Sequence, residues 1–146
     1  MTTALALPST EEEIWRYSRI NELDMSKFAS GKLTTTVEGG EGVQLTGAAA
    51  TALVGAGMHV QPDMFAQLNT DTPDVIALQI GKNKVHTQTV VITHSVDKSG
   101  VVAYPRLVID AAENSEIVVV ERFTSADNVH SLVIPVVEVH AAQSAR

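Results

Sequence analysis

Cysteine is absent from the chain, which excludes disulfides, thiolate metal sites and a cysteine nucleophile. Aromatic residues are scarce, with three Phe, two Tyr and one Trp among 146 residues. Basic residues are outnumbered: ten Lys and Arg stand against 17 Asp and Glu, which gives a formal net charge of −7. This balance argues against a nucleic-acid ligand, because binding to a phosphate backbone needs clustered Lys and Arg.

Long apolar runs and targeting signals are missing as well. No apolar run approaches the length of a membrane span. The first eight residues have neither a basic region nor an apolar run long enough for a signal peptide. A chain of this length is about one domain and could bury roughly two-thirds of its unfolded surface. We therefore expect an acidic cytoplasmic protein with no membrane and no nucleic-acid partner.

The second half of the chain is rich in β-branched residues, which favour extended backbone. From Val75 onward apolar residues recur with a period of two, which predicts β-strands to the C-terminus and confines helix to roughly the first seventy residues. Short polar turns, such as residues 81–83 and 112–115, leave no room for a crossover helix and exclude a βαβ sheet. In residues 116–123 both parities carry apolar side chains, so we expect this strand to be covered on both faces.

A faint internal echo appears at an offset of about thirty residues. The first block, Leu107, Ile109 and Ala111, falls on Val137, Val139 and Ala141, and a small polar run follows each block. The echo suggests stacked β units, interrupted in mid-repeat.

Residues 1–74 differ from the β-rich residues 75–146 and are expected to form a separate region of short helices and loops. Thr10 and Glu13 have the spacing of a capping box, which predicts a short helix from Glu11 to about Arg19. Pro62 predicts the first turn of a second helix. Between them, glycines cluster in residues 39–47 and indicate a turn-rich arm, preceded by a short strand at Leu33 to Val37.

The residues that could carry chemistry do not form a recognisable set. The five histidines are scattered, unlike the tight local pairs of most zinc sites. The glycine run at residues 39–42 lacks the Lys-Ser/Thr pair of a phosphate loop. Carboxylates at Asp110, Glu113, Glu116 and Glu121 could be cast as a glycosidase acid/base pair, but nothing gives two of them different environments. The residues therefore predict no catalytic or metal-binding group.

Five segments stand out in order along the chain: Glu12-Glu13-Ile14-Trp15-Arg16-Tyr17, Phe65-Ala66-Gln67-Leu68-Asn69, Pro105-Arg106-Leu107, Ala112-Glu113-Asn114-Ser115-Glu116 and Val120-Glu121-Arg122-Phe123. Together they resemble the SufB/SufD family of iron–sulfur cluster assembly proteins, on its SufD side, from about residue 11 to the end. The resemblance implies the start of a right-handed parallel β-helix over residues 75–146, preceded by the short-helix and loop region.

By resemblance, the chain is a non-catalytic scaffold whose partners are a SufB-like protein and a SufC-like ATPase. The iron–sulfur cluster belongs to the full complex, and the family's cluster-assembly and SufC-binding residues lie in a later region without counterpart here. No catalytic, cofactor-binding or metal residue is therefore carried over. The motif positions carried over, as packing residues, are Glu12, Trp15, Arg16, Tyr17, Phe65, Leu68, Asn69, Pro105, Arg106 and Glu121.

Two other classes stay open: a β-helical carbohydrate-active enzyme and a plain β-rich interaction module. The enzyme would need an aromatic-lined groove, and three of the six aromatic residues lie before residue 29. Because no capping segment follows residues 136–144, we expect the chain to be the N-terminal part of a longer protein, with an open edge prone to self-association. Trp15, on a helix too short to be stable alone, is expected to be largely buried.

Overall fold

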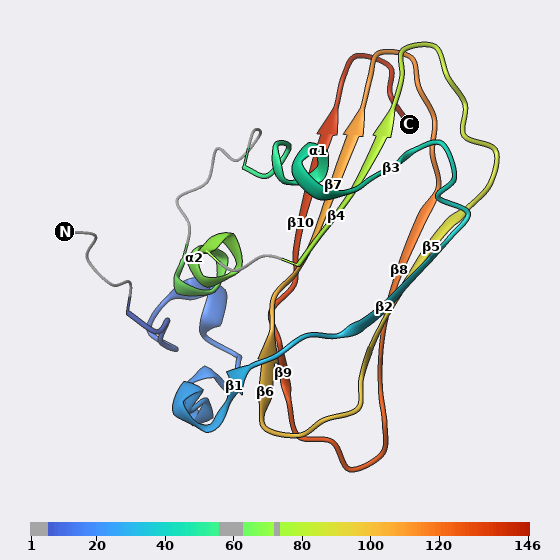
Figure 1. The fold of residues 1–146 in the computed structure, drawn as a ribbon. Helices are drawn as coiled ribbons and strands as arrows, with labels where there is room; N and C mark the ends of the chain where they lie inside the picture. The colour runs from blue at the N-terminus through green and yellow to red at the C-terminus, as the bar shows by residue number, and fades with distance from the viewer. Residues whose placement is uncertain (1–5, 56–62, 72–73) are drawn as a thin grey trace.

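The computed structural model describes residues 6–55, 63–71 and 74–146, which form a mainly β structure (Figure 1). Ten strands are assigned in these ranges, together with two short α-helices, α1 (Gly47–Thr51) and α2 (Met64–Asp71). Three single-turn 3-10 helices precede them: η1 (Glu13–Trp15), η2 (Ile20–Glu22) and η3 (Met25–Lys27). The strands expected after Val75 are confirmed, since residues 74–146 contain no helix.

The strands pair into three sheets (Figure 1). The largest has the order β10-β7-β4-β3, the second β2-β5-β8 and the third β1-β6-β9. Their bounds are β1 (Ala29–Ser30), β2 (Thr34–Glu38), β3 (Gln44–Leu45), β4 (Asp74–Ile80), β5 (Val90–Val96), β6 (Val101–Ala103), β7 (Pro105–Ala111), β8 (Val119–Ser125), β9 (Leu132–Val133) and β10 (Val136–Ala141).

Within each sheet the later strands pair in parallel. Val75 lies opposite Arg106, which in turn lies opposite Val136, so each neighbour follows after about thirty residues. The echo seen in the sequence corresponds to this pairing, because Leu107 lies opposite Val137. Parallel neighbours normally need a long connection. Here the chain supplies it by passing through the other two sheets before it returns.

Two of the sheets are mixed, because β2 pairs antiparallel with β5 and β3 pairs antiparallel with β4. The predicted strand at residues 33–37 is therefore present as β2. The glycine run forms the turn between β2 and β3. Gly39 has a φ of +72°, and a Cβ there would lie 2.4 Å from the carbonyl oxygen of Thr89. Only glycine fits that position without a backbone shift.

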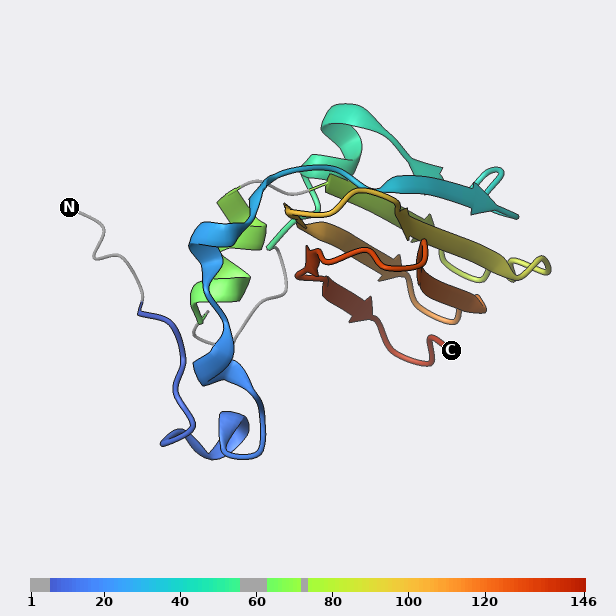
Figure 2. The same ribbon diagram turned by 90° about the horizontal axis from the view of Figure 1, so that it is seen from below.

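The core lies between the sheet β10-β7-β4-β3 and the sheet β2-β5-β8. Alternate side chains of β4, β5 and β7 point inward and pack in one cluster, which includes Leu78, Ile92 and Leu107. His94 shares their parity and is buried, as the alternation predicts. On the outer face of the largest sheet, Ala50 of α1 packs on Ala77 and Val108. Figures 1 and 2 both show α2 and the N-terminal 3-10 turns lying to one side of the strands.

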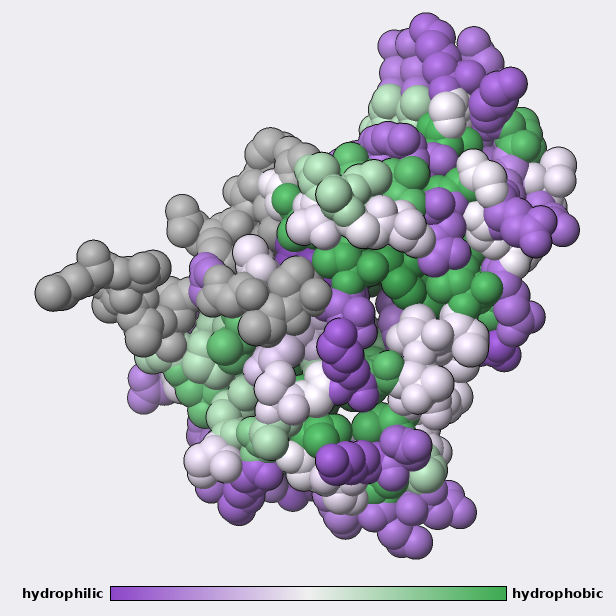
Figure 3. Space-filling view, in the orientation of Figure 1, coloured by the Kyte–Doolittle hydropathy of each residue, from purple (hydrophilic) through white to green (hydrophobic). Residues whose placement is uncertain are grey.

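The turns that follow β4, β7 and β10 lie side by side at one end of the largest sheet (Figure 1). Each places a residue with positive φ at the same position: Asn83, Asn114 and Ser144. Asn114 donates from its side-chain amide to the Asn83 side-chain oxygen at 3.0 Å, and Lys82 pairs with Glu113 at 2.8 Å. In Figure 3 hydrophilic surface gathers over these turns, and hydrophobic surface lies along the strands below them.

Two predictions are wrong in detail. Residues 11–19 do not form one helix, because η1 is a single 3-10 turn. The reciprocal capping contacts lie one residue earlier than expected: Ser9 N–H donates to the Glu12 carboxylate at 3.0 Å, and the Ser9 hydroxyl accepts from Glu11 N–H at 3.3 Å. The strand predicted to be covered on both faces is β8, which is an edge strand: Val120 and Phe123 on it are exposed, as is Val118 immediately before it.

The predicted helix start at Pro62 lies outside the described residues, although α2 follows two residues later. Within the described ranges no helix combines the length and apolar character needed to cross a membrane.

Candidate functional site

The helix α2 positions the second motif of the sequence against the strands. The Asp63 carboxylate accepts from the backbone N–H of Ala66 at 2.8 Å and so caps the helix. Phe65 and Leu68 are half-buried on this helix, and Asn69, one residue after Leu68, is fully buried. Their spacing puts Phe65, Leu68 and Asn69 on one side of the helix, because residues three and four apart are neighbours on its surface.

Asn69 connects α2 to two chain segments that are far away in sequence. Its amide nitrogen donates to the backbone oxygens of Pro105 at 2.9 Å and Ile134 at 2.8 Å. Its side-chain oxygen accepts from Arg106 Nη1 at 2.9 Å. One amide therefore holds the helix to the start of β7 and to the segment that leads into β10.

Arg106 is the centre of this network. It is buried on β7, the middle strand of the three parallel ones, and its guanidinium pairs with the buried carboxylate of Glu138 on β10. Arg106 Nη1 also donates to the Thr70 hydroxyl at 3.2 Å. The Glu138 carboxylate in turn accepts from the backbone N–H of Gly55, at 2.8 Å from Oε2. Charged hydrogen bonds of this kind are about twice as strong as neutral ones.

The same arrangement limits what this cluster can do chemically. Both charges are removed from water and neutralise each other, so the pair is costly to break but supplies no free acid, base or nucleophile. His140 Nε2 lies 3.9 Å from Glu138 Oε2, too far for a hydrogen bond. The network therefore acts as a clasp between α2, the segment after α1 and the largest sheet.

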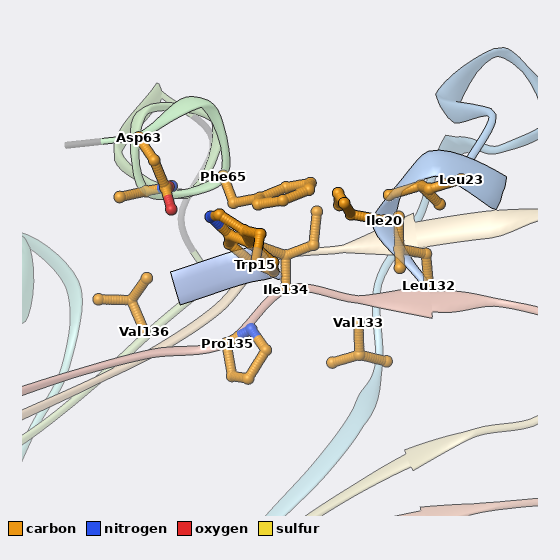
Figure 4. Close-up of a pocket in the computed structure, with 11 residues that line it drawn as sticks. Trp15, Ile20, Leu23, Asp63, Phe65, Leu132, Val133, Ile134, Pro135 and Val136 are labelled. Carbon is orange, nitrogen blue, oxygen red and sulfur yellow. The ribbon is translucent and has the colours of Figure 1, made fainter. Parts of the chain in front are cut away.

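Next to this clasp, the first motif meets the second. The rings of Trp15 and Phe65 contact each other with centroids 5.5 Å apart and an interplanar angle of 58°. They line an apolar pocket of about 460 Å³ whose other walls come from η2, the following loop and residues 132–136 (Figure 4). Trp15 is half-buried, so the expectation of a largely buried indole holds only in part. Its neighbours Ile14 and Tyr17 point into solvent, with Tyr17 94% exposed.

Among the other motif residues, Pro105 joins the clasp, because it is buried and accepts from Asn69 through its carbonyl. Glu12 is exposed and caps the turn before η1 through Ser9. Arg16 forms an exposed ion pair with Glu13 at 3.3 Å.

Glu121 belongs to a second cluster, around the buried His94 in the sheet β2-β5-β8. Its carboxylate lies 3.1 Å from Nε2 of His94, whose Nδ1 lies 2.8 Å from the Thr35 hydroxyl. The Phe123 ring stacks on the imidazole at 4.9 Å. A neutral His94 satisfies both contacts if Nε2–H donates to Glu121 and the Thr35 hydroxyl donates to Nδ1. His94 is therefore a hydrogen-bonded core histidine, as predicted from its position in the alternation with Val90 and Ile92.

Among the described residues, two groups have a shifted pKa. Burial raises the pKa of the Tyr104 hydroxyl, immediately before β7. The side-chain hydroxyl and backbone N–H of Ser26 hydrogen-bond to the Asp24 carboxylate and lower its pKa. Neither group lies in the clasp or in the His94 cluster, and Asp24 acts as the cap of η3.

Three of the four carboxylates considered for glycosidase chemistry have separate partners. Asp110 accepts from Gln79 at 2.9 Å, Glu113 from Lys82, and Glu121 contacts His94. No group of three or more His, Cys, Asp or Glu side chains in the described ranges could hold a metal ion. His59 lies outside those ranges.

Sequence reasoning missed Glu138, the partner of Arg106. Its side chain points to the outer face of the sheet, between Val137 and Val139 on the inner face, and polar residues at such positions are normally solvated. The offset of about thirty residues could have predicted this pair. It places Glu138 opposite Val108, two residues along β10 from Val136, the register partner of Arg106.

In comparisons with known proteins, no family model, no curated protein and no solved structure matches the chain.

Proposed function

We propose that this chain is a SufD-like scaffold component of an iron–sulfur cluster assembly complex and is non-catalytic by itself. The observation that carries the proposal is the meeting of motifs that are distant in sequence. Trp15 of the first motif contacts Phe65 of the second, and Asn69 of the second binds Arg106 of the third. If the resemblance of these motifs to one family were accidental, there would be no reason for residues of different motifs to contact one another in the fold.

The same proposal includes the fold. In it, the three sheets are the faces of a right-handed parallel β-helix, and the chain forms the first coils of that β-helix. Parallel pairing at an offset of about thirty residues supports it, because β7, β8 and β9 each add one parallel strand to one of the three sheets, and β10 adds a further one to the largest sheet. The stacked turns at Asn83 and Asn114 give further support. The antiparallel strands β2 and β3 then form the cap at the first coil.

A scaffold role fits the chemistry of the buried ionisable groups. Arg106 pairs with Glu138 and His94 with Glu121, so each of these ionisable side chains is held by another strand of the fold and not directed at a substrate. The expected partners are a SufB-like protein and a SufC-like ATPase in the cytoplasm. The iron–sulfur cluster is cargo of the assembled complex, and this chain contributes shape and docking surface.

A chimera tests the proposal. Residues 11–146 replace the corresponding N-terminal part of a SufD protein, and the chimera is expressed with SufB and SufC. We expect a soluble complex of all three proteins and restored growth of a SufD-deficient strain under iron limitation.

Two results bear on the alternatives. A folded chimera that does not co-purify with SufB and SufC contradicts the family role and leaves a plain interaction module. Loss of the complex on Glu138→Ala within the chimera, but not on Glu41→Gln at an exposed carboxylate, supports the clasp as the element that the assembly needs.

A further inference from the structure

The apolar pocket beside Trp15 contains a feature that the scaffold role does not use. Among the lining residues that the structure describes, Asp63 alone is charged, and the others are aromatic, aliphatic, Ala or Pro. Its volume of about 460 Å³ lies within the range of small-molecule sites, which are mostly apolar with a few polar groups that set specificity.

The two aromatic rings of the pocket do not lie flat against each other. With an interplanar angle of 58° and centroids 5.5 Å apart, Trp15 and Phe65 form a corner whose faces carry the negative side of the ring quadrupole. A cation placed against such faces is attracted, most strongly by Trp. Figure 4 shows Asp63 at the same end of the pocket as Trp15.

The carboxylate of Asp63 decides the sign of the ligand charge. It accepts one hydrogen bond from Ala66 N–H as the cap of α2, and the full negative charge outweighs the partial positive charge at the start of so short a helix. A net formal charge of −7 on the chain acts in the same direction.

We propose that this pocket binds a small organic cation, an alkylated ammonium with an apolar body, between Trp15, Phe65 and Asp63. The ammonium sits against the aromatic corner near the carboxylate, and the apolar part of the molecule contacts Leu132, Ile134 and Pro135. Cation binding here does not require the assembly role proposed above, although Trp15 and Phe65 also form a contact on which that proposal rests.

Trp15 is the only tryptophan of the chain, so its fluorescence reports on this pocket alone. The probes are choline and its uncharged isostere 3,3-dimethyl-1-butanol, titrated at constant ionic strength into the intact chain of 146 residues. We expect choline to produce a saturable change and to bind roughly five times more tightly than the isostere, a preference set by the cation–aromatic and carboxylate contacts.

Three variants separate the contributions. Asp63→Asn keeps a side-chain oxygen to cap α2 but removes the charge, and should lower the preference for choline about threefold. Phe65→Leu keeps the apolar wall and should weaken choline without weakening the isostere. Asp127→Asn removes one exposed carboxylate from a distant turn and should change neither affinity. Circular dichroism of each variant checks that the fold is retained, and calorimetry repeats the measurement without fluorescence.

The proposal is overturned if choline gives no saturable change, if the isostere binds as tightly as choline, or if Asp63→Asn behaves like Asp127→Asn while remaining folded.

Discussion

The two edges of the sheets are built from similar residues but are covered differently. At one edge the antiparallel strands β2 and β3 lie on β5 and β4, and Val43 of the turn region is buried in the core. At the other edge β8, β9 and β10 each have one neighbouring strand in the described chain. Leu107 on β7 is 3% exposed, whereas its register partner Val137 on β10 is 50% exposed.

The same difference appears in the second sheet, where His94 on β5 is 4% exposed and its partner Phe123 on β8 is 45% exposed. The apolar pattern of a strand thus fixes which side chains point inward. Burial of those side chains requires a neighbour on each side, which only β4, β5, β6 and β7 have. The predictions below alter one edge at a time.

The largest effect is expected where the exposed edge is held by the clasp. Glu138→Ala leaves the buried Arg106 guanidinium without its carboxylate and should lower the free energy of unfolding by about 3–5 kcal/mol. Urea denaturation, monitored by circular dichroism, measures this loss of free energy of unfolding. The double variant Arg106→Met/Glu138→Leu removes both charges and should recover most of the loss; a double variant as unstable as Glu138→Ala would show that the charge is not the cause.

At the covered edge, the tight turn after β2 is the sensitive point. Gly39→Ala should cost about 2–4 kcal/mol, because the new Cβ meets the Thr89 carbonyl oxygen and the positive φ is strained. Gly42→Ala is the matched control: φ is +78°, but nothing lies within 4 Å of the new Cβ, so the cost should be about 1–2 kcal/mol. Equal losses for the two variants in urea denaturation would contradict the steric account.

The exposed edge should also control self-association. An open strand edge with apolar side chains favours pairing with another chain, so residues 1–146 should associate as concentration rises. Val137→Lys/Val139→Lys should reduce this association in sedimentation velocity. Val85→Lys is the control, since Val85 and Val139 are both 60% exposed, but Val85 forms an isolated bridge with Glu116 outside β8, β9 and β10. A wild-type chain that stays monomeric at every concentration contradicts the prediction.

The smallest effect is expected in the stacked turns. Ser144 has a φ of +60° at the position where Asn83 and Asn114 form their side-chain hydrogen bond. Ser144→Asn should stabilise the protein by about 0.5–1 kcal/mol, because Asn tolerates positive φ and can extend the row of amides to a third turn. Thermal unfolding monitors the gain. Ser144→Ala should be neutral or slightly destabilising, and a gain from that variant would exclude the hydrogen bond as its source.

The sequence predicted the strands well and the contacts between them poorly. A period of two after Val75 located β4 to β10, and the parity of His94 predicted its burial, because both depend on local geometry. The double coverage expected for residues 116–123 was wrong, because both parities of an edge strand can be apolar and still remain exposed. The helix expected at residues 11–19 was wrong, because a few residues with caps do not suffice without tertiary packing.

For the candidate site too, the sequence identified several residues but not the contacts between them. Phe65, Asn69, Trp15 and Arg106 could be named from sequence motifs, but the motifs contain no information about which of them touch. Glu138 and the backbone N–H of Gly55 complete the clasp from segments that the motifs do not include.

By itself the sequence determined the alternation of the strands, the positions of the turns and the absence of cysteine chemistry, since these follow from the residue types and their spacing along one chain. Only the tertiary structure decided which faces are buried, which charges are paired and which aromatic rings form a pocket. Those outcomes depend on neighbours that are about thirty or more residues away, as Arg106 and Glu138 are, and a local pattern cannot specify a distant partner.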